Sequence, residues 1–315
     1  MLIESKSDKD LSYEVLLHIY DKGGVDLLTL PKLQSSSLFS GNTSGSNATV
    51  AKSDDLLGDS LDSLIDSGLI VRETVDYGTA YGLTLQGLYA LQQRAEHQLC
   101  DALGMPSLSV DEVRIEAAIE EGSLMGQRLS YCEAGDFLQR LKLNLWGRVG
   151  NSDEPFLIAQ TNMFLADSEA ALQFGAYTLE DILSTSPGAK RYVDAICNHD
   201  VDGEPAQHIY ELTEMLGLEE AIGRHLAIIE EIRIAPALIG KRLGRRIARK
   251  LALRYGQGGG IVIMPVNAYG LSYDLVEGTD MYDVVTEIYT EIGLIPHPQN
   301  GRYLVGDLRK ISGLS

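Results

Sequence analysis

The segment between residues 225 and 270 constrains the fold most, because it changes character three times within a short distance. HLAIIEEIRIAP (225–236) is rich in isoleucine and ends at a proline, as buried strands do. A turn with two glycines follows (237–244), and then an amphipathic basic helix (245–256) that a glycine closes. GGGIVIMPVNAYG (258–270) is a second apolar run. The sequence therefore predicts strand, glycine-containing turn, helix and strand.

This segment also concentrates positive charge. Seven of the 26 Lys and Arg residues lie between 236 and 257 with no acid among them, although the formal net charge of the chain is −19. The free N–H groups and the dipole at the start of a helix favour an anion such as a pyrophosphate. Lys241, Arg242 and Arg245 add full charges there. We expect a local anion site in a chain that otherwise repels polyanions, and the alternative is an ordinary solvated helix face.

IRIAPALIGKRLGRRIARKL resembles the acyl-CoA binding motif of the GNAT superfamily (GCN5-related N-acetyltransferases), in which a strand ending in V-x-P precedes x-x-R-G-x-G-x-G and a helix. Ile234 stands at the V position, and Gly240 and Gly244 match two glycines of the turn. Ile239 replaces the Arg or Gln of the family, and Arg242 replaces its central glycine. The resemblance implies cofactor contacts from Ile232, Ile234, Ile239, Gly240, Lys241, Arg242, Leu243, Gly244 and Arg245.

A second motif follows at the expected distance. VVTEIYTEIGLIPHPQNGRYLVGDL resembles the closing element of the same family, a helix with A-x-x-x-Y-x-x-x-G-F and a final strand. Tyr289, Gly293 and Leu294 fall on its Y, G and F positions. The two motifs together cover 225 onward most clearly and about 125–311 in total. They imply a mixed α/β (α+β) fold with a mostly antiparallel sheet flanked by helices.

The family mechanism assigns roles to three residues. The backbone of the strand after Glu230 would hold the pantetheine arm of acetyl-CoA or another acyl-CoA. A carboxylate would take the proton of the acceptor amine, and we expect Glu230 or Glu231 in that role, of which only one can face the cleft. Tyr289 would protonate the leaving thiolate. Each residue also has a structural alternative: Tyr289 as packing, and the glutamates as solvated groups or partners of Arg233.

The first hundred residues resemble a winged helix-turn-helix domain of bacterial regulators. LDSLIDSGLIVRE and YGLTLQGLYAL carry this resemblance. The expected elements are helices at 11–22 and 31–39, a polar loop at 41–49, a helix capped by Ser53, a hairpin within 69–85 and a helix starting at Thr84.

The third of these helices carries five aspartates and no Lys or Arg between Ser53 and Val71. Phosphates would repel it, so we expect a partner-binding or dimerisation module rather than a DNA reader. Lys52 and Arg72 flank the helix and keep the DNA-binding alternative open.

Between the two resemblances, SVDEVRIEAAIEE (109–121) predicts a helix, and the runs 141–149, 156–166 and 170–179 predict strands of a β meander. A more polar stretch, 184–224, indicates a helical insertion. The resulting domains are 1–103 and 104–315.

Several classes of site are disfavoured. Cys100, Cys132 and Cys197 form no CxxC pair, so we expect neither a disulfide framework nor a zinc site. The cluster CNHDVDGEPAQH (197–208) has the residue types of a metal site but no standard spacing, and an exposed turn is the preferred interpretation. The charged amino terminus does not resemble a signal peptide and no apolar run spans a bilayer, so we expect a cytoplasmic protein.

Three functions agree with these observations. The first is an acyl-CoA-dependent N-acyltransferase. The second is a transcriptional regulator with a degenerate GNAT domain that senses a CoA ester or metabolite, and the third is a catalytically inactive interaction protein. The sequence does not specify the acceptor, although the overall acidity favours a cationic amine such as a polyamine, aminoglycoside or lysine-rich protein.

Overall fold

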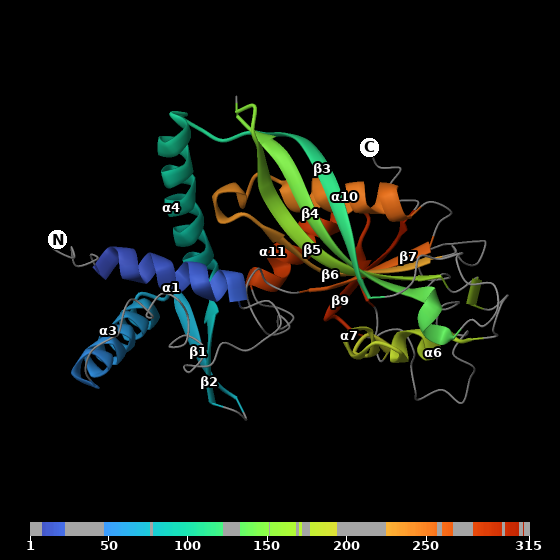
Figure 1. Cartoon of the computed structure of the whole chain (residues 1–315), viewed down its shortest axis with the longest axis horizontal. Helices are drawn as coiled ribbons and strands as arrows, with labels where there is room; N and C mark the ends of the chain where they lie inside the picture. Colours follow the sequence, from blue (N-terminus) through green and yellow to red (C-terminus); the bar gives the residue numbers. More distant parts are fainter. Residues whose placement is uncertain are drawn as a thin grey trace. The chain divides into compact units, whose positions relative to one another are not determined.

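The chain forms two compact units in the computed structural model (Figure 1). The first unit comprises 1–108, 236–239 and 267–274, and the second comprises 109–235, 240–266 and 275–315. The structure describes residues 8–22, 47–75, 78–121, 133–150, 152–167, 170–171, 177–193, 225–256, 260–266, 280–297, 300–308 and 311.

The first unit consists of helices around a two-stranded sheet. Its described elements are α1 (Asp8–Lys22), α3 (Asn47–Asp66), β1 (Ile70–Val75), β2 (Gly78–Leu83) and α4 (Leu85–Leu103). β1 and β2 pair as an antiparallel hairpin. Apolar side chains from the helices and the hairpin bury one another and form the core of the unit; they include Val15, Ile19, Leu57, Leu61, Ile70, Leu83 and Leu91.

Three of the elements predicted for this unit are confirmed. The α1 helix, the hairpin and the start of α4 lie where expected, and the Thr84 hydroxyl caps α4 by accepting from Gly87 N at 3.0 Å. The predicted cap at Ser53 is wrong, because α3 already begins at Asn47. No proline or glycine interrupts 47–57, so nothing ends the helix before Ser53. The helix expected at 31–39 lies outside the described residues.

The second unit is built on one seven-stranded sheet. Its strands are β3 (Val110–Glu121), β4 (Leu138–Val149), β5 (Pro155–Asp167), β6 (His225–Ile234), β7 (Gly260–Pro265), β8 (Ile295–Pro296) and β9 (Tyr303–Asp307). Their order in the sheet is β3-β4-β5-β6-β7-β9-β8. All neighbours are antiparallel except β6 and β7, which are parallel. This confirms the expected mixed fold with a mostly antiparallel sheet.

Helices cover both sides of this sheet (Figure 1). The described helical elements are η1 (Ala134–Phe137), α6 (Leu179–Ser184), α7 (Pro187–Lys190), η2 (Pro236–Leu238), α10 (Leu243–Tyr255) and α11 (Asp280–Thr290), with η2 grouped in the first unit. Ile182, Leu183 and Tyr192 pack on Phe164 and Ile228 in one buried cluster. α10 contacts β6 with an apolar side that includes Ile247 and Leu251.

Two predictions in the middle of the chain are wrong. The helix expected at 109–121 is strand β3, which pairs along its length with β4. From Val113 onward the apolar residues alternate (Val113, Ile115, Ala117, Ile119), and pairing in the sheet overrides the helix propensity of Glu and Ala. The strand expected at 170–179 is also absent from its described positions, because residues 170–171 are helical and α6 begins at Leu179.

Most of the helical insertion expected at 184–224 lies outside the described residues, which include only its first part, with α7. Among the helices that the structure describes, none is long and apolar enough to span a membrane.

Candidate functional site

The site begins where β6 and β7 separate. The two strands pair in parallel from His225 opposite Gly260 to Ile228 opposite Ile263. β6 continues to Ile234 and remains paired with β5 on its other side. Among the described residues no strand pairs with the β7-facing edge of β6 beyond Ile228. Within the described part of the chain, β6 and β7 therefore splay apart after Ile228.

Glu230 lies at an irregularity in β6. The register with β5 moves from Met163 opposite Ile229 to Asn162 opposite Glu231, so Glu230 is an extra residue with no partner position. Such a bulge bends the strand and re-aims the neighbouring side chains. The bulge falls just past Ile228, the last residue of β6 that pairs with β7. Local geometry thus places the buried carboxylate of Glu230 where the two parallel strands part.

The turn after β6 leads directly to the start of α10. Gly240 has φ +79°, and a Cβ added at this position would meet nothing within 4 Å, so the backbone conformation rather than a neighbour demands glycine. Arg242 has φ 58° and ψ 22° and occupies the N-cap position without a side-chain capping bond. The helix therefore begins with N–H groups that its N-cap side chain does not satisfy, as an anion site requires.

The predicted cofactor residues differ in exposure. Ile232, Ile234, Ile239, Leu243 and Gly244 are buried, Gly240 and Arg242 are exposed, and Lys241 and Arg245 are intermediate. Of the predicted cofactor residues, Gly240 and Arg242 are thus the most accessible.

At least four of the seven cations in this segment have partners within the structure. Arg245 forms an ion pair with Glu291, just after α11. Arg246, Lys250 and Arg254 follow one another at intervals of four residues, so they share one side of α10. They donate to the backbone carbonyls of Val110 (2.8 Å), Val113 and Ile115 (3.0 Å) in the edge strand β3.

These four contacts change the interpretation of the charge. The three donors satisfy carbonyl groups of the sheet edge, which would otherwise need water or another strand. Lys241 and Arg242 in the turn are the cations best placed for an external anion, because both lie at the N-terminal end of the helix. The turn can therefore still fit a phosphate group, but it offers two cations to that group rather than the seven that the sequence places in this segment.

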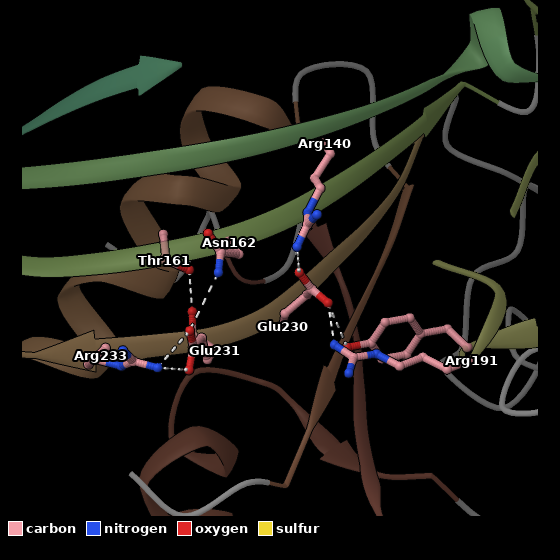
Figure 2. Close-up of polar contacts among 8 residues, drawn as sticks. Arg140, Thr161, Asn162, Arg191, Glu230, Glu231 and Arg233 are labelled. Atoms are coloured by element: carbon pink, nitrogen blue, oxygen red, sulfur yellow. Dashed lines mark hydrogen bonds and ion pairs between the residues drawn. The ribbon is translucent and has the colours of Figure 1, made fainter. Parts of the chain in front are cut away.

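Glu230 is the centre of a buried ion-pair cluster (Figure 2). Its side chain is 5% exposed, it pairs with Arg191, and Arg140 Nη2 lies 3.9 Å from its second oxygen. The Tyr192 hydroxyl lies 3.5 Å from the first oxygen. Burial raises the pKa of Glu230 above its ordinary value, and Arg191 and Arg140 oppose that rise by favouring the anion. Burial also raises the pKa of Tyr192, helped by the charge of Glu230.

Glu231 has different partners. Its carboxylate accepts from Arg233 Nη2 at 3.0 and 3.1 Å and from Asn162 Nδ2 at 3.4 Å. Its side chain is 20% exposed, against 5% for Glu230. The pairing with Arg233 agrees with the structural alternative stated for this residue. Of the two candidate bases, Glu231 is therefore the more accessible.

Tyr289 lies in the last turn of α11 and is almost fully buried, with 1% of its surface exposed. Its carbonyl accepts from Ile292 N and Leu294 N at the turn that ends the helix. Gly293 has φ +92° in that turn, which explains the glycine of the closing motif. The structure thus gives Tyr289 a packing role, and its hydroxyl is buried.

Arg191 and Arg140 belong to the site but were not found by sequence reasoning. Arg191 lies 39 residues before Glu230, directly after α7, and Arg140 comes from β4. Neither belongs to a motif, and only the paired strands and the packing of α7 bring them to Glu230. The metal-like cluster at 197–208 lies outside the described residues, and the described part of the chain holds no group of three or more potential metal ligands.

Comparisons of this chain with protein-family models, with curated proteins and with solved structures found no match.

Proposed function

We propose that this protein is an acyl-CoA-dependent N-acyltransferase, in which the second unit binds the cosubstrate and the first unit binds a partner or a second subunit. One observation carries the proposal. A parallel strand pair separates after Ile228 and Ile263, and the longer strand leads through a turn with Gly240 to the uncapped start of α10. That arrangement offers backbone groups to an extended arm and N–H groups to a diphosphate, the two features that acyl-CoA combines.

The turn supplies the charge for the diphosphate. Lys241 and Arg242 lie beside the first N–H groups of α10, and the helix dipole adds positive potential there. Arg242 occupies the position of the central glycine of the resembling motif, yet its backbone is left-handed, the conformation that glycine adopts most readily. The backbone shape thus agrees with the motif although the residue does not.

The proposed reaction moves one acyl group and two protons. The amine nitrogen forms a bond to the thioester carbonyl carbon as the carbon–sulfur bond breaks. The proton released by the amine goes to a carboxylate, Glu231 or Glu230, directly or through water, and the thiolate takes a proton from an acid. Tyr289 is the candidate acid. Because its side chain is buried, the thiolate would have to enter the fold to reach its hydroxyl.

The pairing and burial of the three candidate catalytic residues favour a second function. Glu230 and Glu231 are both paired with arginines, and Tyr289 is buried. A protein that binds a CoA ester without turning it over would have no need for a free base. The second candidate is therefore a CoA-ester sensor with regulatory function.

For the first unit we propose a winged helix that contacts protein rather than DNA. The described elements run helix, helix, hairpin, helix, in agreement with such a domain. Asp59, Asp62 and Asp66 are exposed on α3, the helix that would enter the groove of DNA. Their charges would repel phosphates with no counterion release to compensate. A gel shift at low salt is the test, and retardation of duplex DNA would overturn this assignment.

The enzymatic proposal is tested by two measurements. Acetyl-CoA should raise the melting temperature, because a ligand at about 100 times its Kd adds about 2.7 kcal/mol to the free energy of unfolding. Thiol release with a panel of amines then separates the two candidates: turnover supports the transferase, and binding without turnover supports the sensor. Absence of any thermal shift at millimolar acetyl-CoA contradicts both.

The role of Tyr289 has its own test. If its hydroxyl protonates the thiolate, Tyr289→Phe should lower kcat about 100-fold with little change in acetyl-CoA binding. Equal turnover in the variant would leave Tyr289 with the packing role that its burial already indicates.

A further inference from the structure

The surroundings of Glu230 contain more positive than negative charge. Glu230 and Glu231 face the guanidinium groups of Arg140, Arg191 and Arg233, so these five side chains carry one net positive charge. The side chains of Arg140 and Arg191 are 32% and 43% exposed, whereas Glu230 is 5% exposed. The carboxylate is thus buried beside two arginines whose side chains are partly exposed.

Aromatic rings hold the two arginines in position. The Arg191 guanidinium lies 4.9 Å from the centre of the Tyr192 ring, and that of Arg140 lies 5.6 Å from the centre of the Phe164 ring. Stacking on a ring fixes the plane of a guanidinium. A guanidinium fixed in this way is prepared to bind a carboxylate, because less side-chain freedom is lost on binding.

The same face of the sheet changes from apolar to polar at this cluster. On this face, Phe164 and Ile228 lie on one side of the cluster and are buried in a core that includes residues of α6 and α7. On the other side, Gln160 donates to Asn144 at 2.9 Å and Asn162 donates to Glu231 at 3.4 Å, and all three amide side chains are partly exposed. A small polar molecule placed on this half would have hydrogen-bonding side chains beneath it and the arginines at its border.

We propose that Arg191, assisted by Arg140, binds the carboxylate of an amino-acid-like acceptor whose amine lies toward Glu231. The inference rests on the proposed function, since it names the acceptor of that transfer. It favours a zwitterion over the purely cationic amines that the overall acidity suggests. A zwitterion carries no net charge, so the field of a chain with net charge −19 does not repel it.

The test compares amino acids with the amines that lack only the carboxylate: L-lysine with 1,5-diaminopentane, and L-histidine with histamine, extended to the other amino acids. The variants are Arg191→Gln, Arg191→Lys, and Lys190→Gln as a control that removes a neighbouring exposed charge. Thiol release with acetyl-CoA gives the KM of each acceptor, and the melting temperature without acetyl-CoA gives binding independently of turnover.

For at least one pair, we expect the KM of the amino acid to be about tenfold or more below that of its amine. Arg191→Gln should abolish this preference without changing the KM of acetyl-CoA. Arg191→Lys should retain part of it, because lysine keeps the charge but not the planar fork, and Lys190→Gln should retain all of it. Equal use of both members in every pair, or a loss in Arg191→Gln that affects both members equally, overturns the inference and leaves the transferase intact.

If no acceptor is turned over, the proposed function fails and the melting temperatures decide the inference. A shift with an amino acid at roughly 10 mM that is absent for its amine and lost in Arg191→Gln still supports the carboxylate site. No shift with any amino acid at that concentration contradicts it.

Discussion

At the scale of single residues, Arg242 is unusual both in the sequence motif and in its backbone conformation. It replaces a glycine of the resembling motif, and its φ of 58° lies in the left-handed region, where a side chain is strained. Sequence comparison and backbone geometry therefore identify the same position independently. The turn keeps the shape that a glycine would favour while presenting a cation.

This strain predicts that Arg242→Gly stabilises the protein. Glycine avoids a cost of about 1 kcal/mol in the left-handed region, partly offset by its greater freedom in the unfolded chain. Urea unfolding should show a higher midpoint for Arg242→Gly and a lower one for Lys241→Gly, its neighbour, whose φ is not among the positive values. A lower midpoint for Arg242→Gly would show that the guanidinium has a stabilising contact worth more than the strain.

Glu230 predicts a dependence of stability on pH. Burial raises the pKa of the folded-state carboxyl, so the folded protein binds its proton more tightly than the unfolded chain does. The free energy of unfolding therefore falls as the pH rises from the ordinary pKa of the group to the raised one. Glu230→Gln cannot ionise and lacks this fall. Its melting temperature, relative to the wild type, should be higher near pH 7.5 than near pH 4.

Asp181 provides a control of opposite sign. Hydrogen bonds from the Thr178 side chain and backbone hold its pKa below the ordinary value. Its contribution to stability is present at neutral pH and is lost as the pH falls through the lowered pKa. Asp181→Asn should therefore be less stable than the wild type at neutral pH, and the difference should shrink in acid.

For Glu230→Gln, a difference in melting temperature from the wild type that does not change with pH would contradict the raised pKa of Glu230.

At the scale of elements, the join between α3, the hairpin and α4 shows why a short motif is informative. The phrase LTLQG places Thr84 as cap and Gly87 in the first turn of α4. A Cβ on Gly87 would lie 1.9 Å from the carbonyl oxygen of Leu69, so only glycine permits the close approach of the helix to the residue before β1. The Thr84 hydroxyl also donates to Gly68 O at 2.6 Å.

Gly87→Ala should consequently destabilise the first unit by about 3 kcal/mol or more, because backbone must move to accept the methyl group. Gly58→Ala is the matched control: it lies inside α3, and its Cβ would meet nothing within 4 Å. It should stabilise by about 0.5–1 kcal/mol through helix propensity. Thermal unfolding followed by far-ultraviolet circular dichroism measures both, and equal effects of the two substitutions would contradict this packing.

The elements also show what the sequence can predict. The cap at Thr84, the pairing of β1 with β2 and the strand β6 follow from local chemistry and are predicted correctly, whereas the cap at Ser53 is not. β3 was not, because Glu and Ala favour a helix locally and only pairing with β4 makes the segment a strand. The Glu230 cluster could not be predicted at all, since Arg140, Arg191 and Glu230 come from three separate segments and meet through the sheet and α7.

At the scale of the whole molecule, the distribution of charge is the main question. Seven cations lie in one segment of an acidic chain, and this concentration predicts an anion-binding site there. The structure divides them: Arg246, Lys250 and Arg254 hold the edge of the sheet, and Arg245 pairs with Glu291. Lys241 and Arg242, in the turn before α10, form the charged part of the proposed diphosphate site, and Arg249 lies further along the helix. The central claim depends on this turn.

Isothermal titration calorimetry with CoA and with pantetheine tests it most directly. If the turn holds the diphosphate, CoA should bind with one site per chain and about tenfold or more tighter than pantetheine, which lacks the phosphates. The double variant Lys241→Gln/Arg242→Gln should remove most of that difference, and Arg148→Gln, an exposed cation of β4 outside the turn, should leave it unchanged. Equal binding of CoA and pantetheine, or no binding of either at millimolar concentration, would contradict the account.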